Sequence, residues 1–207
     1  LNAGRIAGLK VRRIVNEPTA AALAYGFHSL QEEKVLVVVD LGGGTFDVAI
    51  VDVFEGALEV RASSGESFLG GEDFTRVLAA RVLEKTGVVF ERAELEAPRM
   101  VSRVIQQCEV AQCQVSSAAS AVARVPDRKG DFHPDSPTIT ITKADFEQWV
   151  AYILARIELP IRRALGDAGL KALLGDWLEG VYTAATLDDA LASRDKLTPG
   201  EVIMTRE

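Results

Sequence analysis

The segment from Asp40 to Asp47, Asp-Leu-Gly-Gly-Gly-Thr-Phe-Asp, restricts what this chain can fold into more than any other feature. The β-branched run at 35–39 predicts a buried strand, and a second strand is expected over 45–53. Glycines without a Cβ let backbone N–H groups converge on an anion, and Thr45 adds a hydroxyl. Asp40 and Asp47 can hold a hydrated Mg²⁺. The pattern predicts a phosphate site built on a strand, a turn and a strand.

A plain glycine-rich β-hairpin, in which the two aspartates only satisfy the turn, is the alternative interpretation of this segment. The sequence contains neither the GxxxxGK[ST] nor the GxGxxG pattern, and both of those lead from a strand into a helix. P-loop and Rossmann sites are therefore excluded.

Composition narrows the function classes further. The 207 residues carry a formal charge of −7, which argues against a nucleic-acid binder, and Arg12 and Arg13 are interpreted as solvated side chains. No apolar run approaches the roughly 18 residues of a membrane span. Cys108 and Cys113 lie five apart in a helical pattern, so their thiols diverge and reduced, cytoplasmic cysteines are expected. Two histidines far apart in sequence make a metal site built on them improbable.

The order of elements predicts an α/β fold with a partly antiparallel sheet rather than a series of βαβ units. A helix that begins near Pro18 and ends at Gly26 is expected, and a helix that begins at Thr142 should be broken or kinked at Pro160. Strands are expected at 10–15, 35–40, 45–53, 57–62, 119–125 and 138–142, and further helices at 72–85 and 97–115. Both ends look cut from a longer chain. At the C-terminal end, a strand is expected to begin within 201–207 just before the sequence stops.

Three segments together resemble one protein family. They are Asn16–Gly26, the Asp40–Asp47 turn and Phe68–Phe74, and they resemble the DnaK-type 70-kDa heat-shock chaperones of the actin and sugar-kinase superfamily over about residues 1–170. The resemblance implies the second lobe of an actin-like, ribonuclease-H-like ATPase domain. It implies a mixed sheet with flanking helices (about 1–62 and 140–207) and a smaller peripheral α+β subdomain (about 63–139).

The same resemblance implies roles for residues around the turn. The phosphates of ATP or ADP would lie against Gly42, Gly43, Gly44 and Thr45, while Asp40 and Asp47 would act through Mg²⁺. Glu17 would lie near the metal or the attacking water, or else be a capping or salt-bridging acid. Gly70 and Gly71 would line the phosphate side of the cleft, or else be ordinary helix-start glycines. The family's first phosphate loop and catalytic lysine belong to the preceding lobe.

The adenine end departs from the family pattern. The implied contacts are Glu109, Gln112, Cys113 and Ser116, where Gln112 replaces a lysine and Cys113 an arginine. Cys113 is alternatively a small, partly buried apolar residue. The resemblance implies residues 181–186 in place of the family's glycine-rich adenosine turn, with Ala184 and Ala185 where glycines occur. The segment 170–207 otherwise departs from the family pattern.

The implied function is the nucleotide-binding lobe of a chaperone, inactive by itself, whose ATP-driven closure acts on a separate domain that holds unfolded clients. A nucleotide-exchange factor and a J-domain co-chaperone are the implied partners, with no nucleic acid and no membrane. One alternative is a degenerate lobe that serves mainly as a platform for the exchange factor. Another is a filament protein or sugar kinase, which the Asn-Glu-Pro-Thr sequence at 16–19 disfavours.

Overall fold

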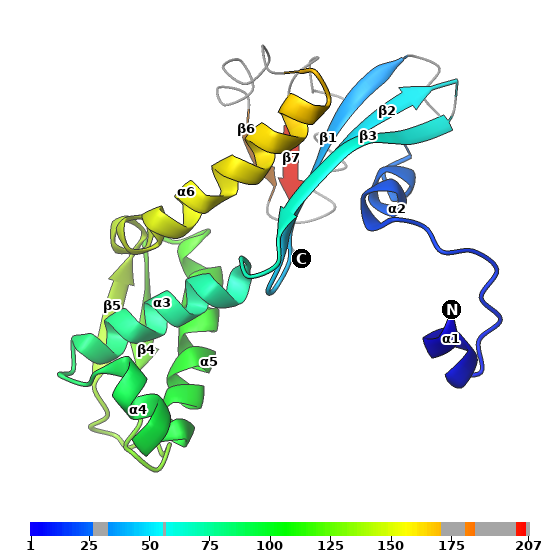
Figure 1. The fold of residues 1–207 in the computed structure, drawn as a ribbon. Helices are drawn as coiled ribbons and strands as arrows, with labels where there is room; N and C mark the ends of the chain where they lie inside the picture. The colour runs from blue at the N-terminus through cyan, green and yellow to red at the C-terminus, as the bar shows by residue number, and fades with distance from the viewer. Residues whose placement is uncertain (27–32, 56, 171–180, 185–201, 206–207) are drawn as a thin grey trace. The chain divides into compact units, whose positions relative to one another are not determined.

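A computed structural model describes residues 1–26, 33–55, 57–170, 181–184 and 202–205 (Figure 1). The chain divides into two compact units. The first unit contains residues 1–40, 47–65 and 160–207, and the second contains residues 41–46 and 66–159. His28, most of the predicted connector at 29–34 and Gly56 lie outside the described residues.

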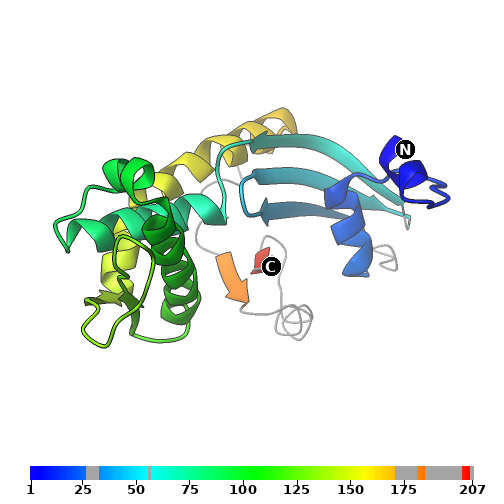
Figure 2. The ribbon, with the colours of Figure 1, turned by 90° about the horizontal axis from the view of Figure 1, so that it is seen from below.

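The first unit contains a sheet of three strands in the order β1-β2-β3, which lie side by side in Figure 2. They are β1 (Lys34–Leu41), β2 (Phe46–Phe54) and β3 (Ala57–Glu66). Short connections require neighbouring strands to run antiparallel. The central strand is buried most deeply, with Phe46 and Ile50 fully inaccessible to solvent. The sequence prediction of these strands is confirmed.

The N-terminal segment holds two helices, α1 (Asn2–Ile6) and α2 (Glu17–Ala24). Pro18 lies in the first turn of α2 and Gly26 follows it with φ of 77°, as predicted. The predicted strand at 10–15 is wrong. A strand needs a partner for its backbone, and this segment pairs with no strand in the described part of the chain. Its Ile14 side chain is 67% exposed.

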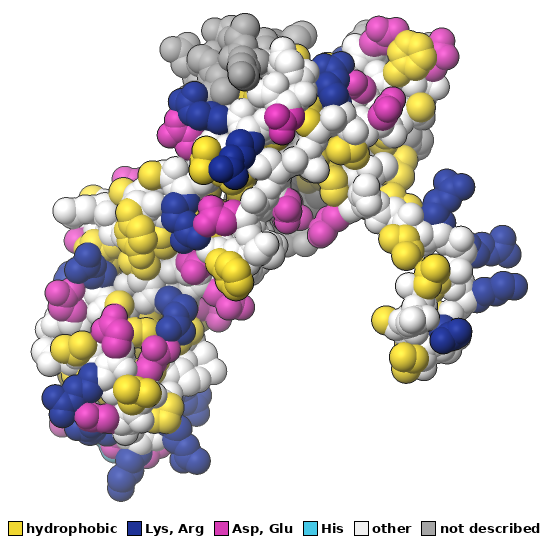
Figure 3. Space-filling model, viewed as in Figure 1, with side chains coloured by type: hydrophobic (Ala, Val, Ile, Leu, Met, Phe, Trp, Pro, Cys, Tyr) yellow, Lys and Arg dark blue, Asp and Glu magenta, His cyan; other side chains and the backbone are white. Residues whose placement is uncertain are grey.

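Basic side chains gather on this N-terminal segment (Figure 3). Arg12 and Arg13 are both exposed, as expected of solvated side chains. None of the helices in the described ranges is both long and apolar enough to cross a bilayer.

The second unit is built on three helices, α3 (Gly71–Glu84), α4 (Phe90–Glu96) and α5 (Pro98–Val115). Helix α5 packs against the other two helices and against the hairpin of β4 (Ser120–Arg124) and β5 (Thr138–Thr142). The hairpin is antiparallel, with Ala121 opposite Ile141. The predictions for α3, α5 and both strands are confirmed. Helix α4 was missed because it is short and buries only Phe90 and Ala93, too few residues for a helical period.

Helix α6 (Lys143–Asp167) runs through both units. The Thr142 hydroxyl accepts the N–H of Asp145 at 3.0 Å, and the Asp145 carboxylate accepts the N–H of Thr142 at 3.0 Å, so the predicted capping pair is confirmed. The helix continues through Pro160, which does not break it. Side chains buried on either side, such as Ile153 and Leu165, stabilise it despite the missing N–H.

Two short strands end the described chain, β6 (Val181–Ala184) and β7 (Val202–Thr205), and they pair in parallel. The strand predicted within 201–207 is therefore confirmed. The segment proposed as an adenosine turn begins with β6, whereas Ala185 and residue 186 lie outside the described residues.

Candidate functional site

The glycine turn, which we define as Gly42–Thr45, connects β1 to β2 and leaves three backbone donors open. It is closed by one bond, in which the Gly42 N–H donates to the Thr45 carbonyl at 2.9 Å. Gly43, Gly44 and Thr45 are exposed. Their N–H groups donate to no protein group within the described residues. Consecutive open N–H groups of this kind form a concave donor set suited to an anion.

The protein itself does not require glycine at two of these positions. A Cβ added at Gly44 meets nothing within 4 Å, and one added at Gly43 meets only the Glu72 Oε1 at 3.8 Å. Neither residue has a positive φ, so an L side chain would not strain the backbone. Among the described residues, neither conformation nor packing explains these glycines.

A pair of glycines at the start of α3, Gly70 and Gly71, packs against the glycine turn. The Gly71 N–H donates to the Gly42 carbonyl at 2.9 Å, and the Glu72 N–H donates to the Gly43 carbonyl at 2.8 Å. A Cβ added at Gly70 would lie 2.4 Å from the backbone of Gly43 and Gly44, a distance that real contacts do not reach. Glycine at 70 is therefore required by packing.

The donors of this second pair are already used. Besides the bond from Gly71, the Gly70 N–H donates to the Asp73 carboxylate at 2.8 Å, and the Asp73 N–H donates to the Gly70 carbonyl at 3.0 Å. Gly70 and Gly71 thus hold the turn in place. Their direct contact with phosphate stays a prediction.

The predicted acidic residues belong to the first unit. Asp40 is half-buried near the end of β1, Asp47 is exposed near the start of β2, and Glu17 is the exposed first residue of α2. None of the three forms an ion pair with another described residue. The described ranges contain no group of three or more His, Cys, Asp or Glu that could hold a metal. The binding of Mg²⁺ by Asp40 and Asp47 stays a prediction.

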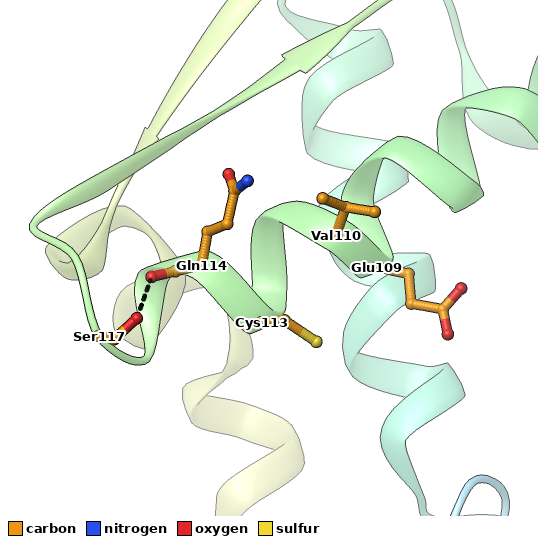
Figure 4. Close-up of a pocket in the computed structure, with 5 residues that line it drawn as sticks. All are labelled: Glu109, Val110, Cys113, Gln114 and Ser117. Atoms are coloured by element: carbon orange, nitrogen blue, oxygen red, sulfur yellow. Dashed lines mark hydrogen bonds between the residues drawn. The ribbon is translucent and has the colours of Figure 1, made fainter. Parts of the chain in front are cut away.

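The residues predicted to face adenine lie on α5, except Ser116, which is the C-cap residue of that helix. Glu109, Cys113 and Ser116 follow helical spacing along one stripe. A pocket beside this part of the chain is lined by Glu109, Val110, Cys113, Gln114 and Ser117, whose side chains are drawn in Figure 4. The Ser117 hydroxyl donates to the Gln114 carbonyl at 3.4 Å (Figure 4).

The two cysteines of α5 differ in exposure. Cys113 is exposed, so its interpretation as a partly buried residue is wrong, and its contact with a ligand stays a prediction. Cys108 is inaccessible to solvent, and burial raises the pKa of its thiol to about 12. Both thiols are free, as the helical spacing predicted.

Gln112 differs from the other three because its side chain meets α3. The hydroxyl of Thr75, a residue only 6% exposed, lies 2.8 Å from the Gln112 Oε1 and 3.1 Å from the Gly71 carbonyl. Sequence reasoning missed Thr75, because nothing local distinguishes it from a surface threonine.

Arg156 was missed as well. Its guanidinium donates to the Glu66 carboxylate and, at 2.6 Å, to the Phe68 carbonyl, and so holds the segment that leads into Gly70. The partners are about ninety positions apart, so no pattern within one element could reveal the contact.

Comparison with known proteins identifies the family. The family model described as Hsp70 protein matches residues 1–174. The heat shock protein hsp-6 of Caenorhabditis elegans is 38% identical over 179 residues, which cover 83% of this chain and 26% of that protein. The chain thus spans about a quarter of the length of this relative. We conclude that the chain belongs to the Hsp70 family, and that its mixed α/β fold is that of the actin-like ATPase lobe of an Hsp70 chaperone.

Proposed function

We propose that the chain binds ATP or ADP together with Mg²⁺, and that the glycine turn holds the phosphates. One observation carries the proposal: Gly43, Gly44 and Thr45 present open N–H groups, and neither packing nor conformation among the described residues requires the two glycines. Backbone donors at positions without a Cβ allow phosphate oxygens to come within bonding distance. The Thr45 hydroxyl would add one more donor.

The aspartates that flank the turn in sequence would hold the metal. Asp40 and Asp47 are carboxylates without ion-pair partners among the described residues, so both are available to a hydrated Mg²⁺. The bound ion would supply positive charge beside the phosphate oxygens. Glu17, exposed and without an ion pair in the described ranges, would lie near the metal or the attacking water.

The base would lie along the stripe of Glu109, Cys113 and Ser116. The thiol of Cys113 offers no positive charge, and Gln112 already contacts Thr75. We therefore expect the adenosine end to contribute less binding free energy than the phosphate end.

The rest of the ATPase machinery would come from elsewhere in a longer protein. Because the chain spans a quarter of hsp-6, we propose that a preceding lobe completes the phosphate site and that this chain alone turns over little ATP. We keep the division into a core subdomain (1–62 and 140–207) and a peripheral one (63–139) as part of this proposal. The longer chaperone would act in the cytoplasm on unfolded clients, with an exchange factor and a J-domain co-chaperone.

A second candidate is a degenerate lobe that mainly engages the exchange factor. The engaged amide of Gln112 and the lack of a positive charge at position 113 favour it. It predicts that the longer protein binds the exchange factor but binds ATP and ADP only weakly.

Calorimetric titration of Mg·ADP into the longer protein tests the first candidate. Gly44→Ala should reduce affinity at least about tenfold, because the new methyl group occupies the space that the phosphate needs. Ser102→Ala, an exposed change elsewhere on α5, should leave affinity unchanged. Tight binding that survives Gly44→Ala would refute the phosphate role of the turn, and rapid ATP turnover by the 207-residue chain would refute the need for a second lobe.

A further inference from the structure

Thr75 is the one buried polar residue among the described residues, and it lies between two functional elements. Its hydroxyl has a single proton. Two acceptors lie within hydrogen-bond distance of it, the Gly71 carbonyl on its own helix and the Gln112 Oε1 on α5. A buried hydroxyl of this kind is costly unless it is bonded, and here the shorter of its two contacts is with the Gln112 side chain.

The contacts continue from Thr75 to the glycine turn. Gly71, whose carbonyl faces Thr75, donates its own N–H to the Gly42 carbonyl at 2.9 Å, and its neighbour Glu72 donates to the Gly43 carbonyl at 2.8 Å. The whole path, from α5 through the first turn of α3 to the turn, lies within the second unit. It therefore depends on no contact between the units.

We propose that Gln112 is a positioning residue for the glycine turn rather than a contact for the nucleotide. The amide oxygen anchors Thr75 and thereby the first turn of α3, whose N–H groups hold the carbonyls of Gly42 and Gly43. This proposal rests on the proposed function, because the glycine turn that Gln112 would position is the segment proposed to bind phosphate.

The side chain at 112 offers a direct way to separate the two roles. Gln112→Glu keeps an oxygen acceptor at the end of the side chain, whereas Gln112→Lys restores a positive charge but has no acceptor. A positioning role requires the acceptor, and a nucleotide contact of the family kind requires the charge. The two variants therefore have opposite expected outcomes.

The first measurement is amide hydrogen exchange on the 207-residue chain without nucleotide. Gln112→Lys and Thr75→Val should each speed exchange of the Gly71 and Glu72 amides about fivefold, the effect of losing one net hydrogen bond. Gln112→Glu should stay close to the unmodified chain. The Ala97 amide, which donates to the Ala93 carbonyl at 2.8 Å, is the internal control. Unchanged exchange at Gly71 and Glu72 in Gln112→Lys would overturn the proposal.

The second measurement compares Mg·ADP with adenosine as probes of the longer protein. A positioning role predicts that Gln112→Lys weakens Mg·ADP more than adenosine, and that Gln112→Glu preserves their ratio. Tighter binding of both probes by Gln112→Lys would overturn the assignment. If the unmodified protein binds neither probe but its amides respond as predicted, the proposed function fails while the structural link from Gln112 to the turn is supported.

Discussion

Two loops of the second unit have glycine close to aspartate in the sequence but differ in how they use their backbone groups. The glycine turn contains glycines beside acids, and so does the loop from Asp127 to His133, defined here as the acidic loop. In the acidic loop the Asp127 Oδ1 accepts the N–H of Lys129 at 2.8 Å and that of Asp131 at 3.0 Å. The Gly130 N–H donates to the Asp127 carbonyl at 3.0 Å. This loop therefore uses the N–H groups of Lys129, Gly130 and Asp131 internally.

The glycines differ in the same way. Gly130 has φ of 91°, and a Cβ there would lie 3.2 Å from the Arg99 Cβ, so both conformation and packing require glycine. Gly44 has neither requirement. We infer a general lesson: a loop that consumes its own donors is part of the scaffold, whereas open donors at glycines without a structural reason indicate a ligand.

The largest expected effect is on stability at the scaffold glycine. Gly130→Ala should lower the free energy of unfolding by about 1–3 kcal/mol, because it adds backbone strain at a positive φ and a tight contact with Arg99. Gly44→Ala should change it by no more than about 0.5 kcal/mol. Urea unfolding of the two variants measures both values. Equal losses in the two variants would break the comparison between the loops.

Sequence reasoning succeeded where the signal is local. The strands on either side of the glycine turn, the capping pair of Thr142 and Asp145 and the ends of α2 all follow from residues a few positions apart. Short-range period, turn chemistry and capping are the physical terms that one segment contains by itself.

Sequence reasoning failed where the cause is a distant partner. It could not tell that packing requires glycine at 70 but not at 44. A Cβ at position 70 would clash with the backbone of Gly44, which lies twenty-six positions away in the sequence. It gave no sign of the contact between Gln112 and Thr75, which lie 37 positions apart, and the adenine contact of Gln112 stays a prediction. It also expected a strand at 10–15 from β-branched residues alone, although a strand forms only when another strand pairs with it.

A smaller effect is expected when the central acceptor of the acidic loop is removed. Asp127→Ala should speed hydrogen exchange of the Lys129 and Asp131 amides severalfold, since both donate to the Asp127 carboxylate. Asp127→Asn keeps an oxygen acceptor and should retain most of the protection. The open amides of Gly43 and Gly44 should exchange rapidly in all three proteins. Slow exchange of those two amides without nucleotide would contradict the open-donor interpretation.

The smallest expected effect is the pH dependence of the same loop. Hydrogen bonds from the Asp131 N–H and the His133 ring lower the pKa of Asp127 to about 2. The Asp127 carboxylate in turn raises the pKa of His133 above 6.5. The stability that protonated His133 adds to the loop is therefore complete below pH 6.5 and is lost as pH rises through the raised pKa of His133. The stability that ionised Asp127 adds to the loop is complete above the ordinary aspartate pKa of 3.8 and is lost as pH falls through about 2.

Protection of the acidic loop should consequently be greatest between about pH 4 and pH 6.5 and should decline modestly toward pH 8. Exchange rates at Lys129 and Asp131, divided by their intrinsic rates at each pH, measure this. His133→Gln should remove the decline of protection above neutral pH. It should leave the loss of protection at acidic pH, which comes from protonation of Asp127. If the decline persists in His133→Gln, the ring of His133 does not stabilise the loop. The contrast between the acidic loop and the glycine turn would then rest only on the backbone N–H groups that donate to Asp127.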